Sequence, residues 1–352
     1  MSDPVRVGVI GTSAWTERMY LASLGSDPHA RVAALCGRRP EHTREVAERW
    51  GVPRTFGDHR EMIAAGGLDA VVVAAPDDEH HPMTLAALDA GLHVLCEKPL
   101  ARTVAQAEEM WRRARAAGVV HMTLFTLRWL PAHRFVRELL AAGRIGEPRA
   151  FAFRFVHGLG LREDLRWRGD PARSEGVLSD LGSHVFDLVH WWLGPVTGVS
   201  AHLRGFGPPT EDGAAPANDS ALVTLELASG AHGTVHLSSR AWVDDRTPTQ
   251  EFTIFGSEGT LEARLARPDA EVRLVTADAG WGVVPVPERL YGGATPDRPT
   301  AVFTTGSAGP RAWIEAIREG RPATPDFEDG WRAQGVIDAA LESARTGCRT
   351  AV

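Results

Sequence analysis

The segment Val5-Arg-Val-Gly-Val-Ile-Gly11 is a short apolar run that ends in glycine, the pattern of a buried strand followed by a turn. Similar apolar runs occupy residues 31–36, 68–75 and 93–97. Helical patterns separate them at residues 41–50 and 82–90. Nearly continuous apolar strands that alternate with helices predict a parallel sheet covered on both faces, an α/β domain. Ligands of such sheets bind at the carboxyl ends of the strands.

The composition narrows the class of protein. The chain has 352 residues, 43% of them hydrophobic, and a formal net charge of −7. The length suggests about two domains, and the acidic balance argues against nucleic acid or an anionic membrane as partner. No apolar run reaches the ~20 residues of a membrane helix, and the start lacks an apolar signal region. With three widely spaced cysteines (Cys36, Cys96 and Cys348), the sequence predicts a cytoplasmic protein without a disulfide framework.

The chain has a single lysine, Lys98, beside 37 arginines. Lys98 lies in Glu97-Lys98-Pro99, so the Gly-Lys-Ser/Thr of a P-loop is absent, and so is the signature set of a protein kinase. One lysine kept in an arginine-rich chain indicates that position 98 needs an ammonium group, which is compact and can exchange its proton. The alternative is that this residue escaped the bias by chance.

The turn after the first strand occupies the place of a dinucleotide-binding Gly-x-Gly-x-x-Gly loop. It reads Gly11-Thr-Ser13-Ala-Trp-Thr16, with Ser13 and Thr16 in place of the second and third glycines. Ser13 can still offer its hydroxyl and N–H to a phosphate at a helix N-terminus. We therefore expect cofactor contacts from Gly11, Thr12, Ser13, Ala14 and Trp15; the alternative is a plain tight turn.

The end of the second strand bears on the choice of cofactor. An NAD site has Asp or Glu there to hold the ribose 2′-hydroxyl, but this chain has Cys36-Gly37-Arg38-Arg39. A glycine followed by arginines leaves space and positive charge for a 2′-phosphate. The sequence predicts NADP(H) as the preferred cofactor, with NAD(H) possible. The alternative is two solvated arginines in a loop.

Longer motifs resemble one known family. Pro76-Asp-Asp-Glu-His80 followed by Glu97-Lys98-Pro99-Leu100 is similar to the Gfo/Idh/MocA oxidoreductases, which include glucose–fructose oxidoreductase and inositol dehydrogenase. The resemblance covers nearly the whole chain and continues, in the expected order, through Phe125-Thr-Leu-Arg128-Trp-Leu-Pro131, Gly143-Arg-Ile-Gly-Glu-Pro148, Trp167-Arg168, Gly176-Val-Leu-Ser-Asp180-Leu-Gly-Ser-His184-Val-Phe-Asp187, Phe255-Gly-Ser-Glu-Gly-Thr-Leu261 and Pro325-Asp-Phe-Glu-Asp-Gly330.

The resemblance implies two domains. Residues 1–124 are expected to form an α/β Rossmann-type parallel-sheet domain. Residues 125–352 are expected to form an α+β domain with an open, mainly antiparallel sheet, whose C-terminal helices (about 310–348) return towards the first domain. Alternation in residues 151–155, 221–227 and 233–237 agrees with such a sheet. The family resemblance also implies a homodimer or homotetramer formed through this sheet.

Residues 177–192 have the apolar spacing of an amphipathic helix. Asp180 and His184 are i, i+4 neighbours on its other face and are expected to touch. As an isolated pattern this is a surface Asp–His pair worth a few tenths of a kcal/mol. The family resemblance instead makes it part of a catalytic set.

The resemblance implies roles for individual residues. Lys98 would hydrogen-bond the reacting oxygen, His184 would be the general acid or base, and Asp180 would orient it. Further cofactor contacts are expected from Pro76, His80, Glu97 and Lys98. Substrate contacts are expected from Arg128, Trp167, Arg168, Asp180 and His184, with the loop 158–175 at the rim of the pocket.

No metal site is predicted, because His80, His81, Asp180 and His184 lack closed ligand spacing.

These observations predict an NADP(H)-preferring oxidoreductase that transfers hydride between nicotinamide and a sugar, a polyol or a related hydroxy or keto compound. One alternative is a cofactor-binding sensor on the same fold, which the altered glycine loop would allow. Another is an enzyme that keeps tightly bound NAD as an internal redox relay. The intact set of Lys98, Asp180 and His184 argues against the sensor.

Overall fold

The computed structural model describes residues 3–161, 165–210, 213–243, 248–265, 270–295, 297–298, 301–304 and 306–352. The chain divides into two compact units. The first consists of Met1–Trp129, Gly292–Ala294 and Thr300–Trp331, and the second of Leu130–Tyr291, Thr295–Pro299 and Arg332–Val352.

The first unit is built on a six-stranded sheet in the order β3-β2-β1-β4-β5-β6, in which every pair is parallel. The strands are β1 (Val5–Ile10), β2 (Ala30–Cys36), β3 (Thr55–Phe56), β4 (Ala70–Val73), β5 (His93–Cys96) and β6 (His121–Thr123). The parallel α/β sheet predicted from the apolar runs is thus confirmed. Strands β3 and β6 have only two and three residues, too short to give a sequence pattern.

The helical elements of this unit are α1 (Ala14–Thr16), η1 (Glu17–Leu21), α2 (Ala22–Gly25), α3 (Pro40–Trp50), α4 (His59–Ala64), α5 (Asp77–Asp89), α6 (Val104–Ala117), η2 (Thr126–Trp129), α9 (Ala301–Thr304) and α10 (Ala308–Glu319). The prediction that α5 starts at Pro82 is wrong, because the helix begins at Asp77 and contains Pro82. Asp77, Asp78 and Glu79 fill its first turn, where carboxylates favour the positive helix end. This places His80 inside the helix.

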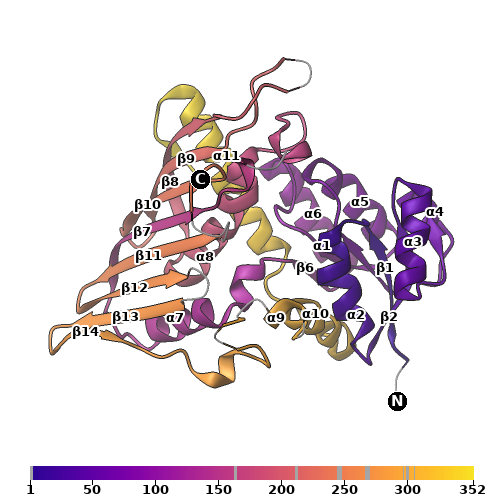
Figure 1. Cartoon of the computed structure of the whole chain (residues 1–352), viewed down its shortest axis with the longest axis horizontal. Coiled ribbons are helices and arrows are strands. Elements are labelled where there is room, and N and C mark those ends of the chain that lie inside the picture. Colours follow the sequence, from indigo (N-terminus) through magenta and orange to yellow (C-terminus); the bar gives the residue numbers. More distant parts are fainter. Residues whose placement is uncertain are drawn as a thin grey trace. The chain divides into compact units, whose positions relative to one another are not determined.

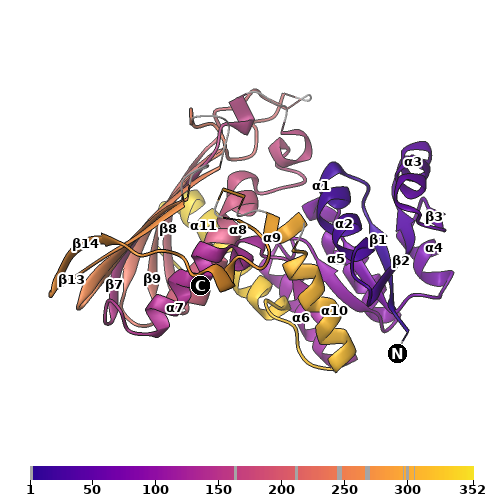
Figure 2. The same ribbon diagram turned by 60° about the horizontal axis from the view of Figure 1, so that its bottom comes forward.

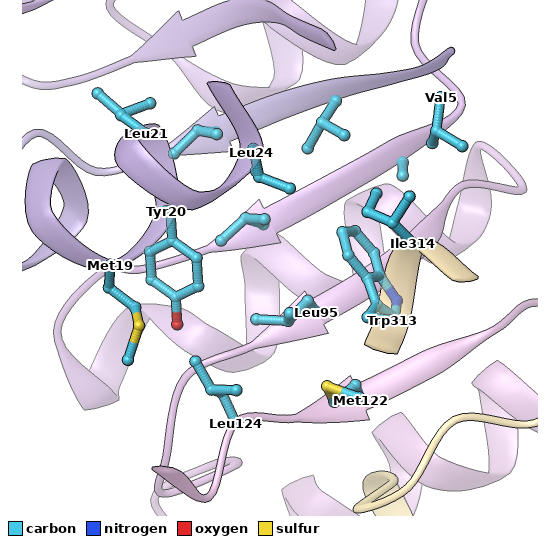
Figure 3. Packing of buried hydrophobic residues seen from close by; sticks show 14 of the residues in the cluster. Val5, Met19, Tyr20, Leu21, Leu24, Leu95, Met122, Leu124, Trp313 and Ile314 are labelled. Carbon is cyan, nitrogen blue, oxygen red and sulfur yellow. The ribbon is translucent and has the colours of Figure 1, made fainter. Parts of the chain in front are cut away.

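Both faces of the parallel sheet are covered by apolar side chains. On one face Val7, Val9 and Val72 pack with Tyr20 and Trp313, and on the other face lie Val71, Val73 and Phe327. Figure 3 shows Tyr20, Leu24, Trp313 and Ile314 in the first of these clusters. Each large side chain fully buried in this way contributes roughly 1.5–3 kcal/mol.

The second unit is built on a nine-stranded sheet in the order β14-β13-β12-β11-β7-β10-β9-β8-β15 (Figure 1). All neighbours are antiparallel except β7 and β10, which run parallel. This confirms the expected open, mainly antiparallel sheet. Its strands are β7 (Pro148–Val156), β8 (Val196–Arg204), β9 (Ser220–Leu227), β10 (His232–Ser238), β11 (Thr249–Gly256), β12 (Gly259–Leu265), β13 (Ala270–Thr276), β14 (Ala279–Val283) and β15 (Thr350–Ala351).

Figure 2 shows this sheet nearly edge-on, with helices α7 (Pro131–Ala141) and α8 (Ser183–Leu193) on one side. Trp192 of α8 packs against Phe153 and Phe252 of the sheet, with its ring centroid 6.2 and 4.9 Å from theirs. The opposite face exposes Arg154, Leu222 and Phe255 among others. The remaining helical elements are η3 (Leu159–Leu161), η4 (Arg166–Gly169), η5 (Leu178–Gly182), η7 (Glu288–Leu290) and α11 (Phe327–Thr346). Within the described ranges, no helix is long and apolar enough to cross a membrane.

Candidate active site

The residues predicted to bind a cofactor follow four strands of the parallel sheet. Residues 11–15 follow β1, residues 37–39 follow β2, Pro76 precedes α5 after β4, and Glu97 and Lys98 follow β5. These four strands are neighbours and all run the same way, so their carboxyl ends lie at one edge of the sheet. The structure therefore brings these segments together in the first unit, where α/β sheets bind ligands.

The first turn keeps its one required glycine. Gly11 has φ +121°, and a Cβ there would lie 2.2 Å from the carbonyl oxygen of Ala74. The Ser13 hydroxyl accepts a hydrogen bond from the N–H of Thr16 at 3.1 Å and so caps the helical run from Ala14 to Gly25. Ser13 and Thr16, which stand in the place of two glycines, thus form a capped first turn at the start of this helical run.

The second turn has no room for an acidic side chain at Gly37. A Cβ there would lie 2.5 Å from Thr43 Oγ1 and 2.7 Å from Thr12 Cγ2. Arg38 and Arg39 are exposed, and no carboxylate in the described part of the chain pairs with them. His42, which the sequence analysis did not single out, lies 2.9 Å from the Thr12 carbonyl oxygen through Nε2. Only the fold, which sets α3 beside the first turn, reveals this contact.

Glu97 receives hydrogen bonds from the first helical segment. Its Oε1 accepts from Trp15 Nε1 and from Tyr20 Oη, each at 2.6 Å. Its Oε2 accepts from the backbone N–H of Lys98 at 3.2 Å. Burial and the neighbouring Glu97 raise the pKa of the Tyr20 hydroxyl well above its ordinary value, so Tyr20 remains a donor. Sequence reasoning missed Tyr20.

His80 is fully buried and joins two strand ends. Its Nδ1 lies 2.7 Å from the Pro99 carbonyl oxygen and its Nε2 lies 2.9 Å from the Ala75 carbonyl oxygen. Carbonyl oxygens only accept hydrogen bonds, so this geometry favours a ring that carries a proton on both nitrogens. Burial by itself would lower the pKa of His80, but the Cys96 sulfur, the Asp77 carboxylate and the Pro99 carbonyl together raise it to about 10.

We expect His80 to carry two ring protons near pH 8. The pKa of His80 in the folded protein lies above the ordinary value of 6.5. The stability that the charged ring contributes is therefore fully present below pH 6.5 and is lost as the pH rises through about 10. Two-bond ¹⁵N–¹H spectra of the ring nitrogens check this. His133 is the internal control, because burial lowers its pKa to about 4 and one nitrogen faces Gln250 Oε1 at 2.8 Å. A singly protonated His80 would contradict the assignment.

In the second unit, the predicted helix over residues 177–192 contains a π-helical turn. The backbone N–H of Ser183 bonds the carbonyl of Leu178, five residues back, and α8 starts only at Ser183. The continuous α-helix expected there is therefore wrong at its first turn. The Ser183 hydroxyl donates a hydrogen bond to the Ser179 carbonyl oxygen at 2.6 Å. The Ser183 backbone N–H therefore bonds the carbonyl one residue further back, which makes the turn wider. Asp180 lies in the π-turn and His184 in α8.

Asp180 forms an ion pair with a residue predicted to bind substrate. Arg168 Nε lies 3.5 Å from Asp180 Oδ1, and the Arg168 guanidinium lies over the Trp167 ring at 4.3 Å from its centroid. These three residues therefore form one cluster in the second unit. His184, the second residue of α8, is buried. Of the loop 158–175, residues 162–164 lie outside the described part of the chain.

Arg128 is buried in the first unit rather than exposed at a surface. Its Nη2 lies 2.9 Å from Asp329 Oδ1, so it ties η2 to the start of α11. Its substrate contact stays a prediction. Among the residues that the structure describes, no group of three or more His, Cys, Asp or Glu side chains gathers as a metal site requires.

Two family models together match most of the chain. Residues 5–125 match the NAD-binding Rossmann fold of the Gfo/Idh/MocA oxidoreductase family, and residues 137–352 match its C-terminal alpha/beta domain. The chain belongs to the Gfo/Idh/MocA family. The resemblance seen in the sequence is thereby confirmed, and the chain is an NAD(P)-dependent oxidoreductase.

Relatives from this family align with nearly the full chain. A levoglucosan dehydrogenase of Pseudarthrobacter phenanthrenivorans is 28% identical over 87% of this chain and 85% of its own. A 1,5-anhydro-D-fructose reductase of Ensifer adhaerens is 30% identical over 97% of each chain. A solved levoglucosan dehydrogenase, in complex with NADH and levoglucosan, superposes with a TM-score of 0.88 at 25% identity and 99% coverage of both chains.

Proposed function

We propose that this oxidoreductase prefers NADP(H) and transfers hydride between the nicotinamide and a hydroxyl carbon of a sugar, a polyol or a related hydroxy or keto compound. The observation that carries the proposal is the carboxyl edge of the parallel sheet, where the Gly37-Arg38-Arg39 segment, the Gly11 turn and Lys98 follow β2, β1 and β5, three of four consecutive strands in the sheet order β2-β1-β4-β5. The two relatives named above are, by their names, a levoglucosan dehydrogenase and a 1,5-anhydro-D-fructose reductase, and this supports the substrate class.

The residues at this edge fit a dinucleotide. At Gly11 and Gly37 a Cβ would collide with backbone or with a neighbouring side chain. The two turns therefore carry no side chain there, and a dinucleotide can approach their backbone closely. The N–H groups of residues 12–15 would hold the pyrophosphate at the start of the helical run. A bound nicotinamide supplies the hydride acceptor in oxidation and the hydride donor in reduction.

The preference for NADP(H) rests on charge. Arg38 and Arg39 are exposed beside Gly37, and no described carboxylate neutralises them. Guanidinium groups bind phosphate through paired, charge-assisted hydrogen bonds. An Asp or Glu that would hold a 2′-hydroxyl and repel a 2′-phosphate is absent from residues 36–39. The site therefore attracts the 2′-phosphate that distinguishes NADP(H) from NAD(H).

The chemical roles follow from the family set of Lys98, Asp180 and His184. Lys98 would donate a hydrogen bond to the reacting oxygen and stabilise the negative charge that develops on it. His184 would take the hydroxyl proton in oxidation and return it in reduction, since histidine changes charge near neutral pH. Asp180 would orient His184. Pro76, His80 and Glu97 would support the nicotinamide side.

Arg168 and Trp167 remain our candidates for substrate contact, together with Arg128. The ion pair from Arg168 to Asp180 links substrate binding to the acid–base pair, because a substrate that contacts Arg168 alters the charge beside Asp180. We also propose that the protein is a homodimer or homotetramer that covers the exposed face of the second sheet, where Leu222 and Phe255 are solvent-accessible.

Replacing Arg38 by Ala tests the cofactor preference. We expect NADPH binding to weaken by about 10- to 100-fold, the effect of losing a hydrogen bond to a charged group, while NADH binding changes less than about threefold. Calorimetric titration with both nucleotides measures this. Arg44→Ala is the matched control, because Arg44 lies in α3 and pairs with Glu41. An equal loss of both nucleotides would refute the 2′-phosphate role.

Two rival functions predict different kinetics. A sensor would bind NADPH and reduce or oxidise nothing, and a relay enzyme would purify with nucleotide that does not exchange. Absorbance at 340 nm, followed with NADP⁺ and a panel of sugars and polyols, separates them. The proposed function expects reduction of added NADP⁺ by at least one member of the panel.

A further inference from the structure

One carboxylate connects the cofactor-binding turn to Lys98. Glu97 Oε1 is shared by two donors from the helical segment after β1: the indole of Trp15 and the hydroxyl of Tyr20, both at 2.6 Å. Glu97 Oε2 accepts the backbone N–H of Lys98. The two donors lie 82 and 77 residues before Glu97 in the chain, so the fold alone creates the group.

All three groups donate their hydrogen bonds to Glu97. An indole N–H and a backbone N–H have no acceptor form, and the raised pKa of Tyr20 keeps its hydroxyl protonated. Glu97 is only 7% exposed, and a buried carboxylate is costly unless hydrogen bonds replace its water. Three donors replace that water. These bonds therefore restrict the orientation of the carboxylate.

The two ends of the group meet different surroundings. Trp15 is 39% exposed and lies in the turn proposed to hold the pyrophosphate. Tyr20 is fully buried in the core next to Met19 and Leu95, within the π-helical segment Glu17–Leu21 (Figure 3). Tyr20 thus anchors the carboxylate, while Trp15 can be touched by a ligand.

We infer that Glu97 is a positioning residue that couples occupancy of the first turn to the placement of Lys98. When the first turn is occupied, Trp15 would shift its indole N–H at Oε1, and the Glu97 carboxylate would pass that shift through Oε2 to the Lys98 backbone. Anchoring by Tyr20 limits the carboxylate to a small set of orientations. The inference rests on the proposed function, since it assumes that the first turn binds the nucleotide.

The rare residues of this chain make the test sharp. Lys98 is the only lysine, so protein grown with ¹³Cε-lysine gives one side-chain resonance, and Tyr20 and Tyr291 are the only tyrosines, so ¹³Cζ-tyrosine gives two. Spectra are recorded for the full chain without nucleotide and with NADPH. The variants are Trp15→Phe and Tyr20→Phe, which each remove one donor and keep an aromatic ring.

Matched controls exist in the same chain. Trp50 is 38% exposed and donates its indole N–H to Glu17 of the same helical segment at 2.9 Å, so Trp50→Phe removes a bond of the same kind that does not involve Glu97. Tyr291→Phe removes the other phenol. We expect the Lys98 resonance to shift or double in Trp15→Phe and Tyr20→Phe without nucleotide, and to stay unchanged in both controls. In the wild type, NADPH should shift the Lys98 and Tyr20 resonances together.

Kinetics give a second readout. Loss of one bond to the carboxylate should lower kcat by about tenfold and leave the sugar KM within about twofold, because Lys98 is misplaced rather than removed.

An unchanged Lys98 resonance in folded Trp15→Phe and Tyr20→Phe would overturn the inference and leave the proposed function standing. Should the wild type bind no NADPH, the proposed function fails, while the spectra without nucleotide still decide the link. If Tyr20→Phe does not fold, Trp15→Phe, at a partly exposed position, decides alone.

Discussion

Lys98→Met is expected to lower kcat for the sugar substrate by about 10²–10³-fold, the effect of removing one donor from a developing oxyanion. Methionine has a similar length and no charge, so it fills the partly buried position after β5 without an ammonium group. Steady-state kinetics at saturating NADP⁺ measure the loss. Thermal unfolding should shift by no more than a few degrees.

The Lys98→Arg variant tests whether position 98 needs only a positive charge or specifically the compact ammonium group of lysine. If position 98 needed only a positive charge, arginine would restore most of the turnover, and the chain uses arginine everywhere else. We expect Lys98→Arg to remain strongly impaired, because the planar guanidinium cannot replace a compact ammonium at one oxygen. Near-normal turnover of Lys98→Met in folded protein would remove Lys98 from the mechanism.

His184→Asn is expected to lower kcat/KM by about 10²–10⁴-fold, the range for loss of a positioned general acid or base. Asparagine keeps hydrogen-bonding atoms but cannot exchange a proton near neutral pH. The pH profile is the diagnostic measurement: the limb that belongs to the base should disappear together with the activity. Added imidazole should restore part of the turnover in His184→Ala.

His190→Asn is the matched control for this change. His190 lies on the same helix, α8, six residues after His184 and near its C-terminal end. It should keep kcat/KM within about twofold, as expected for a residue outside the chemistry. If His184→Asn retained a wild-type pH profile, another group would have to carry the proton.

The apolar runs predicted the parallel sheet because strands buried on both faces leave a strong local pattern. The start of α5 was mispredicted because Pro82 favours a first helical position, yet three consecutive acids at residues 77–79 extend the helix backwards. The π-turn at Leu178–Gly182 was missed for a different reason. Five residues are too few to tell a period of about 4.4 from 3.6, and the turn depends on the Ser183 hydroxyl.

The candidate site was predictable where its residues follow strand ends, since the topology of a parallel sheet brings those ends together. The contacts between distant residues were not. Trp15 and Tyr20 reach Glu97, and Arg128 reaches Asp329, across separations of 77 to 201 residues, which no local spacing encodes. Arg168 was predicted to contact substrate, but its ion pair with Asp180 could be found only in the folded second unit.

Binding of NADPH and of NADH to the purified protein is the most direct test of the proposed cofactor site. The purified protein is titrated with NADPH and with NADH while energy transfer from its 11 tryptophans to the reduced nicotinamide is followed. We expect saturable binding of both nucleotides, with NADPH tighter by about tenfold or more, as one charge-assisted phosphate contact requires. Failure of nucleotide-free protein to bind either would contradict the cofactor site and, with it, the proposed hydride transfer.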